Sequence, residues 1–459
     1  MDTKALRQKI LDLAIRGKLV PQDPNDEPAE VLLERIREQK QQMFKEGKLK
    51  KKDIKNDTII FKGEDNLHYE KLQDGTVKCI EDEIPFEVPE GWAWCKLNDI
   101  YNFIDYRGAT PTKITNGIPL VTAKNVKSGY IDYTIDDYIS EEEFKERQQR
   151  GISKKGDILF TTEAPLGNAA LADMEKFSAG QRLITFQQYG SKNELINYVM
   201  LMFILSDFFQ QQLYVNKTGS TVAGIKAAIL KTLWIPVPPY NEQLRISNTL
   251  KSAINLIDSI SKNKEILSTS ISNTKSKILD LAIRGKIVPQ DPNDEPASVL
   301  LERIRAEKEE LIKQGKIKRD KKESVIFKGD DNSYYGIHLP DSWNWASLRE
   351  IALSISDGSH NPPPNNGSGI PLLSAANIND NSILMNEISR WITNEEWKIE
   401  NQRTNIEVGD VLLTIVGSIG RSAVVQNNNH FALQRSVAVI KPCLREYPKV
   451  CVNLQTDVR

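Results

Sequence analysis

The chain has 459 residues, of which 39% are hydrophobic and 27% charged, and its formal net charge is −1. This length gives room for two or three domains, each with its own core. No apolar run reaches the ~18 residues of a membrane span, and the N-terminus lacks the apolar core of a signal peptide, so we expect a cytoplasmic protein without membrane contact. The 4 cysteines and 4 histidines are scattered, which argues against a disulfide framework and a metal site.

The N-terminal segment 1–46 contains a stretch that recurs almost unchanged. Residues 9–37 read KILDLAIRGKLVPQDPNDEPAEVLLERIR, and 27 of these 29 residues are identical in residues 277–305. The offset of 268 residues is far longer than the roughly 20 to 50 residues of a solenoid repeat. The two copies, which we name the first and second connector, therefore introduce two large modules. Glu-Pro followed by an apolar run predicts a short helix at 28–45 and another at 296–313.

Basic clusters follow each connector. Blocks of like charge are usually solvated linkers, so we predict basic linkers at 47–84 and 314–338, with phosphate contact as the alternative. The net charge of −1 by itself argues against a dedicated nucleic-acid-binding domain. As an average over the chain, however, it conceals these basic clusters. The residues concerned are Lys48, Lys50, Lys51, Lys52, Lys55, Lys313, Lys316, Lys318, Arg319, Lys321 and Lys322.

The two modules, 85–240 and 339–459, share landmarks in the same order. Both have a Trp-x-Trp pair, Gly-Ile-Pro-Leu, Gly-Asp-(Ile/Val)-Leu and Gln-Arg, at offsets of 251 to 253 residues. Short β-rich runs punctuated by glycine predict mixed α/β (α+β) domains of one fold. The Trp pairs, Trp92/Trp94 and Trp343/Trp345, are expected to anchor the cores, with base stacking as the alternative.

A long helix is predicted from Asn241 to Gly285. The interval has no proline and carries a 4-3 spacing of apolar residues, which is typical of a coiled coil. At 1.5 Å per residue, ~40 residues make a rod of about 60 Å. Its apolar stripe must pack against another helix of this chain or of a partner. The expected interface residues are Ile246, Leu250, Ile257, Ile260, Leu267, Ile271, Ile278 and Leu281.

The ordered set of motifs, which also includes Thr218 to Thr221, Ile235 to Pro239 and Glu242-Gln243, resembles the specificity subunit of type I restriction-modification systems over nearly the whole chain. The resemblance implies two target-recognition domains in tandem, joined by long coiled-coil helices, each reading half of a bipartite site in double-stranded DNA. It also implies that the helices set the spacer and dock two methyltransferase subunits, which restriction subunits join.

The resemblance implies no catalytic residue, metal or cofactor on this chain. S-adenosylmethionine, ATP and Mg²⁺ are expected on the partner subunits of the DNA adenine methyltransferase and ATP-dependent endonuclease complex. A stand-alone nuclease or methyltransferase is the alternative from another class. Asn361-Pro362-Pro363 is similar to an adenine methyltransferase motif, but Pro364 stands where an aromatic residue is needed and no glycine-rich donor loop accompanies it. An assembly scaffold without DNA contact is disfavoured, because the two modules differ at equivalent loops.

Glycine-flanked polar loops hold the expected DNA-contacting residues. Arg suits guanine, and Asn or Gln suits adenine. Gln181-Arg182 and Gln434-Arg435 recur unchanged, which favours a common structural or phosphate role. The candidates are Tyr106, Arg107, Thr110, Lys113, Lys124, Asn125, Lys217, Thr218, Ser220 and Thr221 in the first module, and Ser359, His360, Asn361, Asn377, Ser418 and Arg421 in the second.

The second module is expected to be incomplete at its C-terminus. Aligned with the first, it stops at the counterpart of about Ser206, before the Thr-Gly-Ser-Thr segment and the following helix. A truncation, a phase-variable recombination product and a partial gene awaiting a partner are the three explanations. We expect the unpaired central helix to seek a second copy, giving a half-subunit homodimer.

Overall fold

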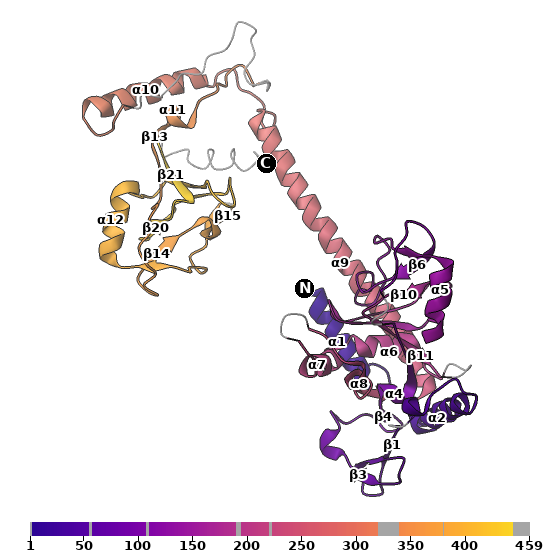
Figure 1. Cartoon of the computed structure of the whole chain (residues 1–459). Coiled ribbons are helices and arrows are strands. Elements are labelled where there is room, and N and C mark those ends of the chain that lie inside the picture. The colour runs from indigo at the N-terminus through magenta and orange to yellow at the C-terminus, as the bar shows by residue number, and fades with distance from the viewer. Residues whose placement is uncertain are drawn as a thin grey trace. The chain divides into compact units, whose positions relative to one another are not determined.

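The computed structural model describes residues 2–54, 57–106, 110–189, 194–219, 223–319, 339–379 and 381–443. The chain divides into two compact units, unit 1 at Met1–Lys264 and unit 2 at Glu265–Arg459 (Figure 1). Each unit mixes helices and strands, and a long helix leads from the first into the second. The predicted α/β (α+β) class with two tandem domains is confirmed.

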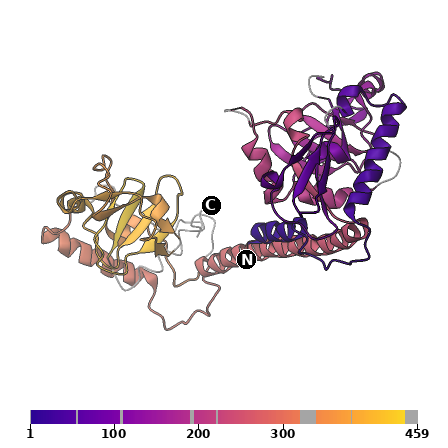
Figure 2. The ribbon, with the colours of Figure 1, turned by 90° about the horizontal axis from the view of Figure 1, so that it is seen from below.

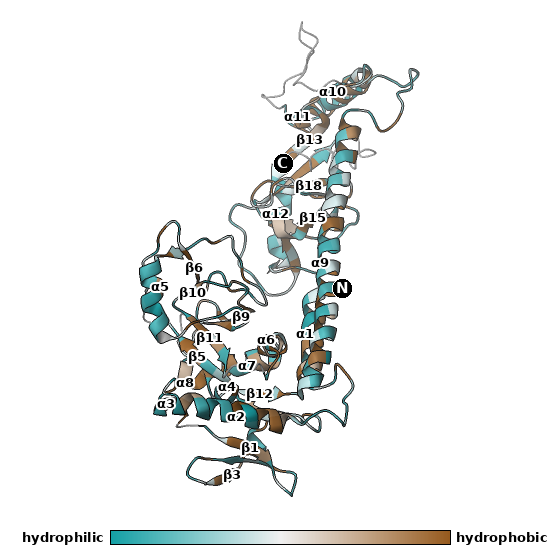
Figure 3. Ribbon diagram, turned by 90° about the vertical axis from the view of Figure 1, so that its right-hand side faces the viewer, coloured by the Kyte–Doolittle hydropathy of each residue, from teal (hydrophilic) through white to brown (hydrophobic). Residues whose placement is uncertain are grey.

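Unit 1 is built on a four-stranded antiparallel sheet in the order β5-β11-β8-β9, with two small sheets in the orders β10-β6-β7 and β12-β4. The helix α6 (Asn197–Ile204) is apolar all round, so it is buried, and Phe203 is fully enclosed. The polar helix α5 (Glu141–Arg147) lies outside and is mostly teal in Figure 3. The strands are β4 Ala93–Lys96, β5 Tyr101–Asp105, β6 Ile118–Val121, β7 Tyr138–Ile139, β8 Ile158–Thr162, β9 Leu166–Leu171, β10 Ser178–Ala179, β11 Leu183–Gln188 and β12 Trp234–Val237.

The remaining helices of unit 1 are α1 Thr3–Ile15, α2 Ala29–Lys45, α3 Lys51–Ile54, α4 Leu97–Ile100, α7 Asp207–Val215 and α8 Ala227–Leu230, with short 3₁₀ turns at η1 Glu81–Glu83 and η2 Gln148–Arg150. Trp92 and Trp94 are buried in this unit, which confirms their expected role as core anchors. In unit 2 Trp343 is exposed and Trp345 half-buried, so the second pair does not fill a core in the described residues.

The interval 47–84 is a folded part of unit 1 and differs from the basic linker that we expected. It holds α3 and a three-stranded antiparallel sheet of β1 (Ile59–Lys62), β2 (His68–Lys71) and β3 (Val77–Cys79). The lysine block covers only the first residues of the interval. The turns Asp65-Asn66 and Asp74-Gly75 then join strand sequences, which are the pattern of hairpins. The corresponding second linker lies mostly outside the described residues.

The predicted long helix is confirmed as α9 (Tyr240–Ile283). Helix α1 lies antiparallel along its first half (Figure 2), where Arg7 forms an ion pair with Asp258. Of the predicted interface residues, Ile246, Leu250 and Ile257 are buried within unit 1, so their partner is this chain itself. Ile260 and Leu281 are half-buried. The other three, Leu267, Ile271 and Ile278, are exposed.

Unit 2 repeats the sheet order of unit 1. Its four-stranded sheet runs β13-β21-β18-β19 and its small sheet β17-β14-β20, as β5-β11-β8-β9 and β7-β6-β10 do in unit 1, with β15 and β16 as an additional pair. Its elements are α10 Ala297–Lys313, α11 Leu348–Ile351, β13 Ala352–Asp357, β14 Ile370–Leu373, η3 Ala375–Asn377, β15 Ile378–Asn379, β16 Ser382–Ile383, β17 Trp391–Ile392, α12 Asn394–Thr404, β18 Val411–Thr414, β19 Ser422–Val424, β20 Ala432–Leu433 and β21 Val437–Pro442.

Candidate nucleic-acid interface

Several loops of unit 1 meet at one edge of its four-stranded sheet. Strands β5 and β8 end there, and β9 and β11 begin there. The Thr110 hydroxyl lies 3.1 Å from Gln181 Oε1, and Arg182 forms a 3.0 Å ion pair with Glu163. Glu163 also bridges to Gly224, which brings in the loop after α7. We name this surface, formed by residues 110, 163, 181, 182, 216–219, 223 and 224, the first loop edge.

The sequence candidates in unit 1 divide into exposed and buried groups. Thr110, Lys124, Lys217 and Thr218 are exposed, as is Lys113, which pairs with Asp137 at 2.7 Å. The exposed cations are therefore accessible to phosphates. Arg107, Ser220 and Thr221 lie outside the described residues.

Two candidates of unit 1 have structural roles instead. Tyr106 is buried and its hydroxyl donates a hydrogen bond to the carbonyl of Gly151. Asn125 is also buried: its Nδ2 donates to the carbonyls of Asp132 (2.9 Å) and Ile135 (2.8 Å). With these hydrogen bonds made inside the protein, Asn125 presents no free amide edge to a base. Both residues are corrections to the candidate set.

Asn377 is the counterpart of Asn125 and is likewise buried, with its amide hydrogen-bonded inside the protein. Its Nδ2 donates to the carbonyl of Glu387 at 2.9 Å, and its Oδ1 accepts from the backbone N–H of Ser374 at 2.9 Å. Only 2% of its surface is exposed. We therefore remove it from the DNA-contacting candidates as well. Polar residues in glycine-flanked loops have two possible uses, and here the amides hold the loop itself together.

The corresponding edge of unit 2 is formed around Ser359, the turn 434–436 and the loop 415–421, and we name it the second loop edge. Ser359 is buried and bridges to Gln434. Asn361 is exposed, and Ser418 and Arg421 are half-buried. The hydroxyl of Thr414 donates to the carbonyl of Ser418, which fixes the loop.

His360 is exposed at the second loop edge and is oriented by Asp357. Its Nε2 lies 2.6 Å from one carboxylate oxygen of Asp357, and Arg403 contacts the other oxygen. Burial acts to raise the pKa of Asp357, but the hydrogen bonds from His360 and Arg403 outweigh it and lower the pKa. The ring of His360 is thus held in place for a contact at this edge.

The Gln-Arg dipeptide is identical in the two sequences but sits at different structural positions. Each dipeptide belongs to a three-residue turn between two strands, 180–182 in unit 1 and 434–436 in unit 2. The backbone N–H at the first turn position donates to the last residue of the parallel neighbouring strand. That donor is Gly180 in unit 1, bonded to Val121 at 2.7 Å, and Gln434 in unit 2, bonded to Leu373 at 2.9 Å.

The third turn position confirms this one-residue shift. The carbonyl of Arg182 accepts from the N–H of Thr162 at 3.0 Å, and the carbonyl of Ser436 accepts from the N–H of Ile415 at 2.9 Å. Strand registers agree, because Ile184 faces Phe160 where Ala438 faces Leu413. The middle position therefore holds Gln181 in unit 1 and Arg435 in unit 2, and sequence alignment missed this because it matched identical letters.

The two edges also differ in character. Where unit 1 has the ion pair of Glu163 and Arg182, unit 2 has the exposed apolar side chains of Ile415, Val416 and Ile419. Sequence reasoning also missed Glu163 as an edge residue, and it assigned Gln181 a structural or phosphate role. The signal for Glu163 was a charged residue directly after a buried strand.

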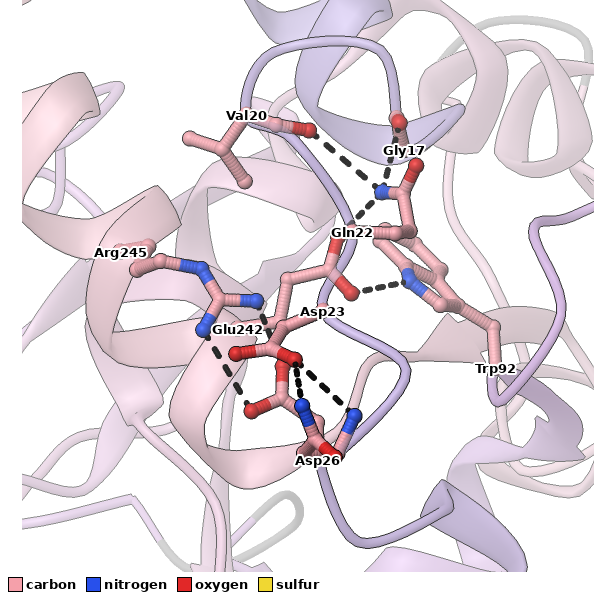
Figure 4. Close-up of polar contacts among 9 residues, drawn as sticks. Gly17, Val20, Gln22, Asp23, Asp26, Trp92, Glu242 and Arg245 are labelled. Atoms are coloured by element: carbon pink, nitrogen blue, oxygen red, sulfur yellow. Dashed lines mark hydrogen bonds and ion pairs between the residues drawn. The ribbon is translucent and has the colours of Figure 1, made fainter.

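The first connector is locked to the start of α9 by polar contacts (Figure 4). Gln22 Nε2 donates to one oxygen of Glu242 at 2.7 Å, and the indole N–H of Trp92 donates to the other at 2.9 Å. Burial raises the pKa of Glu242, although both hydrogen bonds oppose that rise. Asp26 accepts a 2.5 Å hydrogen bond from Arg245. Gln22 and Asp26 thus tie the first connector to the start of α9.

A cavity of about 200 Å³ lies between α2, β1 and β4 in unit 1. It is lined by Lys40, Asp57 and Asp99 among others. Lys40 forms a 2.6 Å ion pair with Asp57, and burial raises the pKa of Asp99 to about 6.

Among the residues that the structure describes, no group of three or more His, Cys, Asp and Glu could hold a metal ion. None of the described helices is both long and apolar enough to span a membrane.

Comparison with known proteins gives one consistent family. The sequence model described as Type I restriction modification DNA specificity domain matches residues 89–268. The Escherichia coli type I restriction enzyme EcoAI specificity subunit is 30% identical over 433 residues, which cover 82% of this chain and 67% of that protein. The chain belongs to the family of type I restriction enzyme specificity subunits.

Other relatives are specificity subunits too. The EcoEI specificity subunit of Escherichia coli is 31% identical over 419 residues, covering 79% of this chain and 65% of the relative. The chain thus spans about two thirds of the length of these curated relatives. Among solved structures, the HsdS subunit from Thermoanaerobacter tengcongensis is 17% identical with a TM-score of 0.38, covering 81% of both chains. A type I R-M system structure is 18% identical with a TM-score of 0.45, covering 78% of this chain and 77% of that one.

Proposed function

We propose that this chain is the DNA-binding specificity subunit of a type I restriction-modification complex. One observation carries the proposal: two units share a sheet order and begin with nearly identical connectors, yet their loop edges carry different side chains. A protein that keeps two scaffolds and varies two equivalent surfaces is suited to reading two different half-sites. The relatives, which are specificity subunits by name, support this role.

The exposed residues of the loop edges suit DNA. The first loop edge offers Lys217 to phosphates, and the exposed Lys113 and Lys124 lie elsewhere on unit 1; phosphate contacts position a protein on the duplex without specifying sequence. Amide, guanidinium and imidazole groups at Gln181, Arg435 and His360 can reach base edges, which carry the sequence information. The chain itself contributes binding, and the chemistry belongs to its partners.

The connectors and α9 are proposed to dock two methyltransferase subunits, which restriction subunits then join. Nearly identical sequences suit identical partners, and the connectors are the part of the chain that occurs twice with 27 of 29 residues the same. The exposed stripe of Leu267, Ile271 and Ile278 on α9 offers apolar area for a helix of a partner or, in its absence, of a second copy in a half-subunit homodimer.

The methylated sequence is the test of this proposal. The chain is expressed with its methyltransferase subunit in a host without other adenine methylation, and methylated bases are mapped across the host DNA. We expect one bipartite motif with a fixed spacer. As a control, exchanging loop 163–165 for residues 416–418 leaves the strands of unit 1 unchanged and should alter only the first half of the motif. Methylation without any sequence preference, or with a single undivided motif, contradicts the proposal.

A further inference from the structure

The middle position of the turn between the small sheet and the large sheet distinguishes the two units. It is occupied by Gln181 in unit 1 and by Arg435 in unit 2, because the shared Gln-Arg dipeptide is displaced by one residue between the two turns. The scaffold around the position is the same. A difference at one site within an otherwise equivalent frame is what separates two readers of different sequences.

The surroundings leave both side chains able to contact a ligand. Gln181 is half-buried, and its Oε1 accepts a 3.1 Å hydrogen bond from Thr110, so its Nε2 donors and a second lone pair on Oε1 stay available. Arg435 is exposed, and within the described residues no carboxylate lies within ion-pair distance of its guanidinium. Its backbone N–H is anchored to the carbonyl of Ser359 at 2.9 Å, which fixes where the side chain starts.

At the third turn position the charge difference between the units is reversed: unit 1 has an arginine there and unit 2 an uncharged serine. In unit 1 it is Arg182, which adopts a left-handed backbone with φ of 70° and pairs with Glu163 at 3.0 Å. In unit 2 it is Ser436, whose hydroxyl accepts the N–H of Ala375 at 3.1 Å. The positive charge of the dipeptide is therefore countered by a carboxylate in unit 1 and projects from the turn in unit 2. A shared phosphate contact would need the same charge at the same place, and the structure does not provide it.

We propose that the middle turn position is a base-reading position, in which Gln181 recognises adenine in the first half-site and Arg435 recognises guanine in the second. The inference rests on the proposed function. A glutamine amide accepts from adenine N6 with its oxygen and donates to N7 with its nitrogen, whereas a guanidinium donates to both O6 and N7 of guanine. Gln181 can donate a hydrogen bond to a phosphate but cannot neutralise it as Arg435 can, whereas both side chains can make a bidentate contact with the edge of a purine base.

The test exchanges the two side chains in the full chain. Gln181→Arg and Arg435→Gln are each assembled with the methyltransferase subunit and S-adenosylmethionine, and a randomised double-stranded DNA library is methylated and sequenced. Gln181→Arg should change one position of the first half-site from adenine to guanine by about tenfold or more and leave the second half-site unchanged. Arg435→Gln should do the converse.

Matched variants separate base reading from charge and from folding. Gln211→Arg makes the same substitution on the exposed surface of α7 and should keep the wild-type motif. Gln181→Ala should lose the preference at the same position without gaining another, and its assembly with the methyltransferase subunit reports folding. Unchanged motifs in both exchange variants, or a weakening that is uniform over all sequences, overturn the inference. A wild-type chain that selects no motif overturns the proposed function instead.

Discussion

The two connectors have nearly the same sequence but different surroundings. In the first, Leu11, Ala14 and Ile15 are buried, and α1 contacts α6 and α7. In the second, the identical residues 279, 282 and 283 are only half-buried at the end of α9. The described residues of unit 2 include no counterpart of α6 or α7. The burial of a side chain thus depends on which elements pack against its helix. The same residue types are in the core of the first connector and only half-buried in the second.

The polar locks differ in the same way. Gln22 reaches both Gly17 and Glu242, whereas its counterpart Gln290 keeps the bond to the carbonyl of Gly285, at 3.1 Å, and is exposed. The turn itself is unchanged: Asp23 and Asp291 each accept the backbone N–H two residues on, at 2.9 Å in both. The connector therefore forms its own turn and relies on α9 only for the outer contacts.

Leu11→Ala should give one of the two largest effects. The side chain is 2% exposed within the main core of unit 1, so its removal should lower the free energy of unfolding of unit 1 by about 3 kcal/mol. Leu279→Ala, the same change in the second connector, should cost about 1 kcal/mol or less, because a half-buried side chain loses less contact. Hydrogen exchange of peptides from α6 and from β18 follows each unit separately. Equal losses at the two positions would break the comparison.

The second effect concerns a buried aspartate that both units share. Asp157 in unit 1 accepts from Gln187 at 2.7 Å, and Asp410 in unit 2 pairs with Lys441 at 2.6 Å. Burial raises the pKa of Asp157 to about 6. An aspartate whose folded pKa is raised stabilises the fold below the unfolded value and loses that contribution as pH rises through the folded pKa. Unit 1 should therefore lose roughly 3 kcal/mol between about pH 4 and about pH 6.

Exchanging the partners of these aspartates sharpens the comparison. Gln187→Lys gives Asp157 the cation that Asp410 has, so the pKa of Asp157 should fall and the loss of stability between about pH 4 and about pH 6 should shrink. Lys441→Gln is the reverse change and should introduce such a loss in unit 2. Urea unfolding followed by tryptophan fluorescence across this range measures both. A pH profile of Gln187→Lys identical to that of the wild type would contradict the assignment.

The sequence was sufficient for some elements and insufficient for others, for physical reasons. Helix α9 follows from an apolar spacing between Pro239 and Gly285 that is interrupted at Lys264 and Thr274, a signal that is local and long. Residues 59–79 form three strands but were predicted to be part of a basic linker, because the lysine block at 48–55 was taken as typical of the whole interval 47–84. Asn125 and Asn377 were misread because a polar loop residue looks the same whether its amide bonds the loop or a ligand.

The one-residue shift at the Gln-Arg turn could not be found from the letters alone. Alignment places identical residues together, whereas strand register is set by the alternation of buried side chains on β11 and β21, and a displacement by one residue changes what every position faces. Residues 180–182 and 434–436 have the same length, so no gap marks the change. The hydrogen bonds of the two turns and the registers of the strands that follow them distinguish the positions.

The smallest of the three effects on stability is expected at the lock between Asp26 and Arg245. The Asp26 side chain is 6% exposed and the Arg245 side chain 34%, so Asp26→Asn should lower the free energy of unfolding of unit 1 by about 1 to 2 kcal/mol. Asp294→Asn is the matched control, because Asp294 is identical in sequence and exposed, and it should change stability by less than about 0.5 kcal/mol. Hydrogen exchange at the start of α9 measures the difference. If Asp294→Asn proves as costly as Asp26→Asn, then the connector turn itself, rather than its contact with α9, requires the carboxylate.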